Sequence, residues 1–336
     1  MNLQQQASAL FEDQKQTWPL LGENWKGLAF AHLRVFEFPG FTIRVQFNPK
    51  RITSSTARVD KDSIARRKCF LCPENRPPEE RHVPFGSGYE ILCNPFPIFN
   101  EHFTIARREH TPQVIDTEFG NLLYLSRELP ELVVFYNAPN CGASAPDHMH
   151  FQAGNRGFMP IEEEIGTLKA RYGGIICQDE KTGKEYSEVL PRNGSACKGS
   201  GTGLVMAVDD GLRRFILLES ETMGFLGSAF NMIHTFMAGL RSNDDPMLNI
   251  LSYYSDRWQV MIFPREKHRP WQYFEKGERN ILLSPASVDM GGTLITPLEK
   301  DFQKITRDDI DDIFSQVSFS PGLFRQLTLY LKSSLA

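Results

Sequence analysis

The sequence predicts an α+β fold in which helices pack on antiparallel sheets, organised as two similar halves. Segments rich in β-branched and aromatic residues alternate with segments of helical spacing. The order of these elements in the first half recurs in the second half, which indicates an internal duplication. The length of 336 residues also suits two domains, or one core made of two related parts.

The N-terminal region carries apolar side chains at helical spacing, so we expect one or two short helices within residues 3–32. Residues 41–49 alternate like a strand and end at Asn-Pro. The first half then continues as strand, strand, helix, strand, loop and strand, over residues 88–99, 102–110, 116–132, 132–137, 138–147 and 148–152. This order returns as a hairpin, a helix and two strands, over residues 204–220, 230–242 and 248–265.

These elements divide the chain into three parts. We expect an N-terminal helical segment over residues 1–40, a catalytic half over residues 41–175 and a degenerate second half over residues 176–336. The last strand of the second half reads WQVMIFP where the first half reads HMHFQAG, so the copy has lost the histidines. The reactive strand is therefore expected in the first half.

Charge and hydropathy exclude several classes of protein. A net charge of -4 and a pI near 6.1 do not indicate the basic surface that binds polymeric nucleic acid. A local basic pocket could still bind a phosphorylated small molecule. The N-terminus lacks the pattern of a signal peptide, and no stretch reaches the roughly 18 apolar residues that a membrane span requires. We expect a soluble, cytoplasmic protein without a membrane or nucleic-acid partner.

Cysteine usage points to thiols or metal ligands. In a cytoplasmic chain of this size, six cysteines are better explained in this way than as a disulfide framework. One pair is close in sequence, Cys69 and Cys72 in CFLC, and a turn-forming stretch follows it directly.

The stretch GASAPDHMHFQAG places His148, His150 and Gln152 at alternate positions. On a strand these side chains share one face, while Met149 and Phe151 pack into the core from the other. Three polar groups together suit a binding or catalytic site. An exposed polar strand face would show the same alternation, so this alternative stays open.

A second set of residues points to the same strand. Cys69, Cys72, His110 and His148 supply two thiolates and two imidazoles, which are the ligands of a closed tetrahedral zinc site. The 38 residues from Cys72 to His110 are too many for a zinc finger, so the fold must bring the ligands together. Unligated structural cysteines are the alternative.

Several motifs resemble one known family. CFLC, NPFPIF, REH (residues 108–110), FYN (residues 135–137) and GASAPDHMHFQ resemble, in order and spacing, the galactose-1-phosphate uridylyltransferase branch of the histidine-triad (HIT-like) superfamily. The resemblance extends to the dinucleoside polyphosphate phosphorylases and GDP-sugar phosphorylases of that branch. In the second half, WQVMIFPREKHRP and SPASVDMGGTLITP resemble the C-terminal half of bacterial members.

The resemblance implies a mechanism and assigns roles. His150 would attack the α-phosphorus of a nucleotide donor and form a nucleotidyl-histidine intermediate, from which a second phosphate takes the nucleotide in a ping-pong transfer. Gln152 stands where hydrolases of the superfamily carry a third histidine, and its amide donates a hydrogen bond without moving a proton, which favours transfer.

Further roles follow from the same resemblance. Asn137 and Ser144 would hydrogen-bond the phosphates, and Asn94 would lie near the ribose. The cysteines and histidines named above would hold a structural zinc ion, with His148 anchoring the strand that presents His150. The spacer between Ser144 and His148 contains Asp147 and is one residue longer than in the uridylyltransferases.

A donor with several phosphates needs cations. Arg51 and Arg265, each just after an apolar run and a proline, are the two arginines that we expect to bind phosphate. The substrates would be a nucleotide or nucleotide sugar and a phosphate or sugar-phosphate acceptor.

Two other functions stay open at this stage: a nucleotide hydrolase of the same superfamily, and a nucleotide-binding protein without turnover. A homodimer is expected if the internal duplication does not replace dimerisation. The nucleobase and the acceptor are left open by the sequence.

Overall fold

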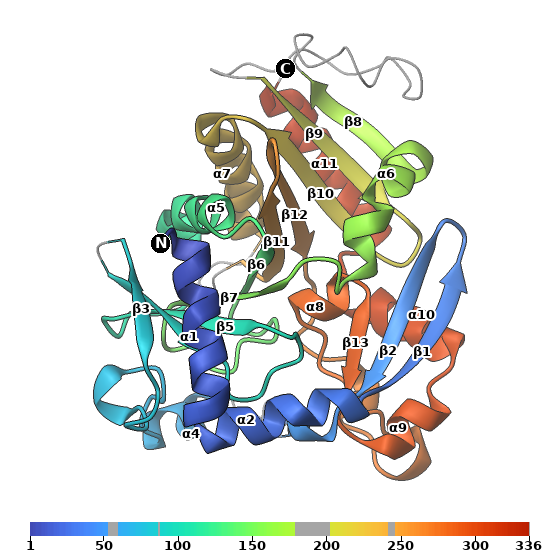
Figure 1. The fold of residues 1–336 in the computed structure, drawn as a ribbon. Helices are drawn as coiled ribbons and strands as arrows, with labels where there is room; N and C mark the ends of the chain where they lie inside the picture. The colour runs from blue at the N-terminus through green and yellow to red at the C-terminus, as the bar shows by residue number, and fades with distance from the viewer. Residues whose placement is uncertain (53–59, 87, 179–201, 241–245, 336) are drawn as a thin grey trace.

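The computed structural model describes residues 1–52, 60–86, 88–178, 202–240 and 246–335, without the side chains of Arg51 and Lys61. The predicted α+β fold is confirmed, because helices pack on two sheets of mainly antiparallel strands (Figure 1). Within these residues, no helix combines the length and apolar character needed to cross a membrane.

The larger sheet has ten strands and runs through both halves of the chain. Its first-half strands lie in the spatial order β3 (His82–Phe85), β4 (Tyr89–Cys93), β5 (His102–Arg107), β7 (His150–Asn155) and β6 (Leu132–Asn137). The second half continues the sheet with β11 (Leu248–Tyr254), β12 (Trp258–Pro264), β10 (Arg214–Ser220), β9 (Gly203–Asp209) and β8 (Gly173–Gln178). Strands β6 and β11 join the halves in an antiparallel pair that sets Asn137 opposite Asn249.

Helices cover one face of this sheet and form the first hydrophobic core. They are α1 (Leu3–Thr17), α5 (Phe119–Glu128), α7 (Met223–Gly239) and α11 (Pro321–Leu335). Phe11, Phe119 and Phe230 from these helices are buried with Met149 and Phe151 from the region of β7. Apolar residues at helical spacing and at strand spacing therefore meet in one core, as the periodicity predicted.

The second face carries a different layer. A three-stranded sheet of β1 (His32–Phe38), β2 (Phe41–Phe47) and β13 (Thr293–Thr296) packs there with α6 (Pro160–Tyr172) and α10 (Arg307–Val317). Strand β13 pairs in parallel with β2, so a segment of the second half completes a sheet begun in the first half. The two halves are interlocked at this point rather than joined only by a linker.

The internal repeat is visible in the order of elements. The run β4, β5, α5, β6, β7 of the first half corresponds to β9, β10, α7, β11, β12 of the second. We propose on this basis that the second half is a degenerate copy. Two boundaries need adjustment: β1 lies inside the expected helical segment 1–40, because HLRVFEF alternates and pairs with β2, and β8 crosses the boundary at residue 175.

The shorter elements complete the fold. They are α2 (Pro19–Lys26), α4 (Lys61–Arg66), α8 (Ser287–Met290), α9 (Glu299–Lys304) and the 3-10 turns Gly27–Phe30, Pro49–Arg51, Pro73–Asn75, Asp116–Glu118, Trp271–Tyr273 and Gly277–Arg279. Helix α8 contacts β6 and β11, which brings residues 284–287 of the second half (SPAS) against the first half.

Candidate active site and metal centre

Strand β7 begins at His150 rather than at His148. His148 lies in a turn, where its N–H donates to the carbonyl of Ala145 at 3.2 Å, while Met149 N–H donates to Thr111 at 2.7 Å. The expectation of three polar side chains on one strand face is therefore corrected. His150 and Gln152 share the face that lines a cavity, and His148 turns away from it toward the cysteines.

The cavity has a volume of about 610 Å³ and lies on the second face of the large sheet, at its first-half end. Its wall combines apolar side chains with a few polar groups, as in sites for small ligands. Five of the predicted site residues line it: Asn94, Asn137, Ser144, His150 and Gln152. The structure thus brings together residues that lie up to 58 positions apart in the chain.

The imidazole of His150 is held in one orientation. Its Nδ1 lies 2.8 Å from the carbonyl oxygen of His148, so Nδ1 carries the proton and donates it, and the lone pair resides on Nε2. Gln113 fixes the backbone by accepting from His150 N at 2.7 Å and donating to its carbonyl at 2.9 Å. The residue is only 3% exposed, and burial lowers the pKa of the imidazole to about 4. A neutral ring with a free Nε2 is the nucleophilic form.

Gln152 is oriented by a residue that the sequence analysis did not single out. His102 is fully buried, and its Nδ1 accepts from the N–H of Ile98 at 3.3 Å. Its Nε2 must therefore carry the proton, which it donates to Oε1 of Gln152 at 3.1 Å. With its oxygen occupied in this way, Gln152 has its amide N–H groups left for a ligand, and no described protein group accepts from them.

Asn137 is oriented from the second half of the chain. Its Oδ1 accepts hydrogen bonds from the backbone N–H of Ser287 at 2.8 Å and from the amide of Asn249 at 2.8 Å. It also lies 2.7 Å from the hydroxyl of Ser287, whose one proton is shared with the carbonyl of Tyr136 at 2.7 Å. Because two N–H donors meet this oxygen, the Nδ2 amide must face the opposite way. Asn137 lines the cavity, so these N–H donors are available to an anion there.

Asn94 and Ser144 are placed differently. Asn94 donates to the hydroxyl of Thr104 at 3.1 Å and accepts from Phe96 N–H at 3.0 Å, so most of its polar capacity serves the protein. No described residue hydrogen-bonds the side chain of Ser144, and its loop contains Gly142 with a φ of 98°. Its backbone carbonyl accepts from Arg67.

Of the two arginines predicted to bind phosphate, Arg265 needs correction and Arg51 stays a prediction. Arg265 is buried, and its guanidinium donates to Asn249 and to the carbonyls of Pro285 and Val317, so it supports the framework and does not reach the cavity. The side chain of Arg51 lies outside the described residues. A short apolar run followed by proline does not distinguish a buried arginine from one in a cavity.

Two other arginines line the cavity in their place. Arg67 donates to Asp147 at 2.6 Å, and its buried Nη1 has no partner in the described structure. Arg269 donates to Ser284 at 3.0 Å and contributes a second positive charge from the second half. Arg67 belongs to the cluster RRK that the sequence shows just before CFLC. Its buried, unpaired nitrogen is the stronger sign of a site for an anion.

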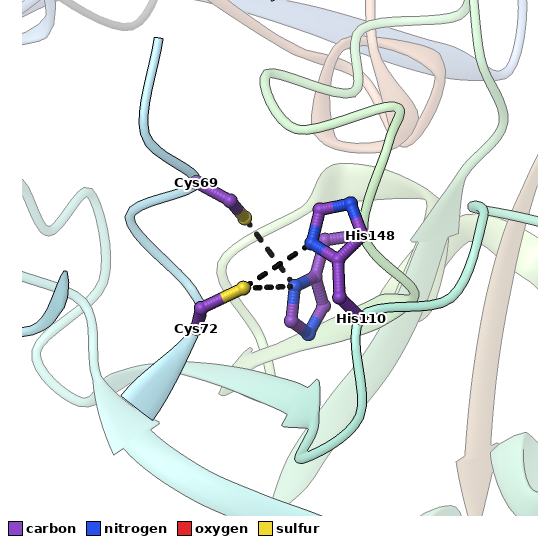
Figure 2. A group of neighbouring side chains, drawn as sticks. All are labelled: Cys69, Cys72, His110 and His148. Atoms are coloured by element: carbon purple, nitrogen blue, oxygen red, sulfur yellow. Dashed lines mark hydrogen bonds between the residues drawn. The ribbon is translucent and has the colours of Figure 1, made fainter. Parts of the chain in front are cut away.

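The four predicted metal ligands lie together beside the cavity. Figure 2 shows Cys69 and Cys72 directed from one loop toward His110 and His148. Their ligand atoms all lie within 4.8 Å of one another. The Sγ atom of Cys69 is 3.3 Å from His148 Nδ1, and that of Cys72 is 3.2 Å from His110 Nδ1 and 3.6 Å from His148 Nδ1.

These distances fit a divalent metal ion. With bonds of about 2.3 Å to sulfur and about 2.0 Å to nitrogen, a tetrahedral ion sets neighbouring ligand atoms about 3.3 to 3.8 Å apart, close to the distances above. Behind the ligands, Nε2 of His148 donates to the carbonyl of Arg107, and Asp147 lies 3.9 Å from Nε2 of His110. Such outer contacts fix the ring that coordinates through Nδ1. The cluster can therefore hold a metal through two thiolates and two imidazoles.

The other cysteines and acidic groups do not extend this cluster. Cys93 and Cys141 are buried thiols outside any disulfide, whereas Cys177 is disulfide-bonded, which departs from the expectation of thiols throughout. Cys197 lies outside the described residues. Glu162 caps its own helix by accepting from Gly157 and Met159 N–H. No second group of metal-ligating side chains occurs in the part of the chain that the structure describes.

Two family models match the chain. Residues 10–155 match the model described as Domain of unknown function (DUF4922), and residues 207–336 match the one described as GDPGP1-like, C-terminal domain. The first covers the metal ligands and β7, and the second covers the segment that carries Asn249, Arg265 and Ser287.

Curated relatives and solved structures agree with these matches. The galactose-1-phosphate uridylyltransferase of Clostridium perfringens (strain SM101) is 24% identical over 313 residues, which is 82% of this chain and 60% of the relative. That of Halalkalibacterium halodurans is 34% identical over 107 residues, 27% of this chain and 21% of the relative. Yeast Ap4A phosphorylase Apa2 superposes with a TM-score of 0.57 at 14% identity, covering 90% of this chain and 97% of that chain.

The sheet order agrees with the fold that this chain shares with the Apa2 structure. The sequence likeness to galactose-1-phosphate uridylyltransferases and to the GDPGP1-like domain supports the HIT-like branch of uridylyltransferases and phosphorylases that the motifs predicted. The chain spans 21% and 60% of the length of the two curated relatives above, so its own activity is a separate question.

Proposed function

We propose that the protein is a nucleotidyltransferase or nucleotide phosphorylase that works through a nucleotidyl-histidine intermediate on His150. One observation carries this proposal: His150 lines the cavity with Nδ1 held on the carbonyl of His148, which leaves Nε2 as the ring nitrogen with the lone pair. An imidazole that cannot turn keeps its lone pair directed at one point, which is the requirement for in-line attack on phosphorus.

The reaction consists of two displacements. In the first, Nε2 attacks the α-phosphorus of a nucleotide donor, an N–P bond forms, and the bond to the bridging oxygen breaks with departure of a phosphate or sugar phosphate. In the second, an oxygen of an acceptor phosphate attacks the same phosphorus, the N–P bond breaks, and the neutral imidazole is restored. The proton on Nδ1 stays in its hydrogen bond to His148 throughout.

The cavity supplies hydrogen-bond donors for the charge on the phosphates. Gln152, Asn137 and Arg67 line it, and the amide oxygens of Gln152 and Asn137 are engaged by His102 and Ser287, which leaves their N–H groups as donors. Fixed donors of this kind stabilise a transition state without reorganisation. The backbone of the loop around Ser144 would add N–H groups, and Asn94 lies beside Thr104, where a ribose would follow the α-phosphate.

Transfer to phosphate is favoured over hydrolysis by the chemistry of Gln152. Its Oε1 is occupied by His102, so the side chain offers donors only and cannot accept a proton from water. A phosphate dianion needs no such base. The relatives agree, since their names describe a uridylyltransferase and a phosphorylase.

The metal of the Cys69, Cys72, His110 and His148 cluster is proposed to be zinc with a structural role. Two thiolates and two imidazoles prefer zinc among the common divalent ions. The ion would fix His148, whose carbonyl orients His150. A homodimer and a cytoplasmic location stay predictions.

The experiment that tests the function is partial exchange. The full-length protein is incubated with a nucleoside diphosphate sugar and the corresponding labelled sugar phosphate, in the absence of any other acceptor. Ping-pong transfer predicts that label enters the nucleotide sugar. The same exchange assay is repeated with dinucleoside polyphosphates and labelled phosphate. No exchange with any donor, in protein of verified metal content and fold, would instead favour the binding protein without turnover.

A further inference from the structure

Strands β6 and β7 stop pairing directly just before the proposed nucleophile. The last pair of their antiparallel ladder is Phe135 opposite Gln152. Both strands extend two positions further, to Asn137 in β6 and to His150 in β7. The same register would set Asn137 opposite His150, but the ladder ends before these two residues.

The side-chain amide of Gln113 stands in the place of this missing pair. Its Oε1 accepts from the backbone N–H of His150 at 2.7 Å. Its Nε2 donates to the carbonyl of His150 at 2.9 Å and to that of Asn137 at 3.0 Å. Because the N–H donor must meet the oxygen and the carbonyls must meet the nitrogen, the orientation of the amide is fixed. The amide thus serves as a strand partner for His150 and links it to Asn137.

Gln113 is itself held firmly in this position. Its side chain is fully buried. Its backbone N–H donates to the carbonyl of Pro146 at 3.3 Å, and its own carbonyl accepts from the hydroxyl of Tyr136 at 2.9 Å. An apolar side chain of equal length would fill the same space but would leave the N–H of His150 without an acceptor. The position therefore requires an amide and not merely a side chain of this size.

The inserted amide widens the sheet at His150. A directly hydrogen-bonded pair would hold the Cα atoms of Asn137 and His150 about 5.5 Å apart. Here the path from the N–H of His150 to the carbonyl of Asn137 contains two hydrogen bonds and an amide group in place of one hydrogen bond. Both residues line the cavity, so the wider spacing of the strands also separates their side chains there.

The proposed reaction needs this separation, because a phosphoryl group has to fit between the two side chains. Attack requires Nε2 of His150 to lie about 3 to 3.5 Å from phosphorus. A hydrogen bond from the amide of Asn137 requires about 2.9 Å to a phosphate oxygen. Side chains of directly paired residues stand only about 4.5 to 5.5 Å apart at Cβ, which leaves little room for a tetrahedral group between them.

We propose that Gln113 is a positioning residue whose amide separates β6 from β7 and so opens the space for the phosphoryl group between His150 and Asn137. The inference rests on the proposed nucleotide transfer through His150. If Gln113 served the stability of the fold alone, its loss would lower the amount of folded protein but not the rate of the chemical step. The rate per folded chain therefore separates the two roles.

The test measures the rate of adduct formation on His150 at saturating donor, per folded and metal-loaded chain, with UDP, GDP and ADP sugars and Ap4A as donors. Gln113→Met keeps the size of the side chain but makes none of the three hydrogen bonds, so the strands should shift. Adduct formation should slow by about hundredfold, which is the effect of a displacement of about 1 Å at a reacting group. The Kd for the donor should change by less than about threefold, because most of its contacts are retained.

Gln272→Met is the matched control. Gln272 is also a buried glutamine, and its amide bonds Asp312 and Gln316 away from the cavity. This variant should lower the free energy of unfolding and leave the rate of adduct formation as in the wild type. A wild-type rate in Gln113→Met, or equal losses of rate in the two glutamine variants, would overturn the inference.

A milder pair of variants decides the question if Gln113→Met does not fold. Tyr136→Phe removes only the hydroxyl that donates to the carbonyl of Gln113, and it should slow adduct formation by about fivefold. Tyr253→Phe removes the hydroxyl of a buried tyrosine that donates to Gln259 in the second half, and it should leave the rate unchanged. Equal rates in the two tyrosine variants would contradict the role of Gln113.

The wild type distinguishes this inference from the proposed function. If the wild type forms the adduct and the variants of Gln113 and Tyr136 form it equally fast, only the positioning role of Gln113 is wrong. If the folded, metal-loaded wild type forms no adduct with any of the donors, the proposed function is wrong as well.

Discussion

Ser287 holds Asn137 in place through Oδ1, which accepts from the backbone N–H of Ser287 at 2.8 Å and lies 2.7 Å from its hydroxyl, whose one proton is shared with the carbonyl of Tyr136. The two residues are 150 positions apart, one in each half of the chain. Because the amide oxygen is occupied by the second half, the amide nitrogen faces the cavity of the first. This contact explains how a half without the histidines still contributes to the site.

We expect Ser287→Ala to slow nucleotide transfer. The variant removes the hydroxyl that lies between Asn137 Oδ1 and the carbonyl of Tyr136, so the amide is less firmly oriented. We expect a drop in transfer rate of about tenfold, with about 1 kcal/mol lost from the free energy of unfolding. The KM for the donor should change less than the rate constant. Ser315→Ala is the control, because its exposed hydroxyl donates only to the neighbouring Asp312 carbonyl, and it should match the wild type in both measurements.

Gly142 of the first half lies in close contact with Ala286 of the second half. Its φ is 98°, and a Cβ added there would lie 2.4 Å from Cβ of Ala286, next to Ser287. Gly142→Ala should therefore lower the free energy of unfolding in urea by roughly 2 kcal/mol or more, from backbone strain and overpacking together. Gly277→Ala separates the two effects, because Gly277 has a φ of 69° with nothing near its Cβ position. Equal losses in both variants would argue against the close contact.

The proposed preference for phosphate over water predicts the behaviour of Gln152→His. An imidazole at this position can accept a proton from water, so the share of intermediate that hydrolyses should rise by about tenfold or more. The measurement is the ratio of nucleoside monophosphate to nucleoside diphosphate formed from one donor at fixed phosphate concentration. Gln152→Ala is the companion variant: it should slow both products without changing their ratio, and an unchanged ratio in Gln152→His would refute the role of the amide.

Metal removal should affect both stability and transfer. Burial and the adjacent Cys69 raise the pKa of the Cys72 thiol to about 11, so a bound cation is needed to keep it as a thiolate at neutral pH. Elemental analysis should find about one zinc ion per chain, lost in Cys72→Ser and retained in Cys93→Ala, whose thiol lies outside the cluster. We expect the metal-free protein to unfold at lower temperature and to transfer slowly. A folded, fully active protein without metal would contradict the structural role.

Much of this site was accessible from local sequence patterns. Alternation predicted that His150 and Gln152 share a face with Phe151 behind them, and ligand chemistry alone gathered Cys69, Cys72 and His110 with His148. The alternation failed at His148, because a turn closed by the carbonyl of Ala145 comes before the first regular strand residue. The alternation of polar and apolar residues does not reveal such a turn.

The residues that orient the site were not predictable in this way. His102 acts through a hydrogen bond to Gln152, and Ser287 and Asn249 act on Asn137 across the junction of β6 and β11. None of them forms a local motif, since their partners are distant in sequence. Arg265 was predicted to bind phosphate because of its sequence position, and this prediction was wrong. Its guanidinium N–H groups donate instead to buried carbonyls of the protein.

The most direct test is the covalent intermediate itself. The full-length protein is mixed with a nucleotide donor and no acceptor, and the intact mass is measured before and after brief acid treatment, followed by peptide mapping. We expect an acid-labile mass increase of one nucleoside monophosphate on His150, which disappears when phosphate is added and is absent in a folded, metal-loaded His150→Ala variant. An adduct that persists in that variant, or transfer without any adduct, would contradict nucleophilic attack by His150.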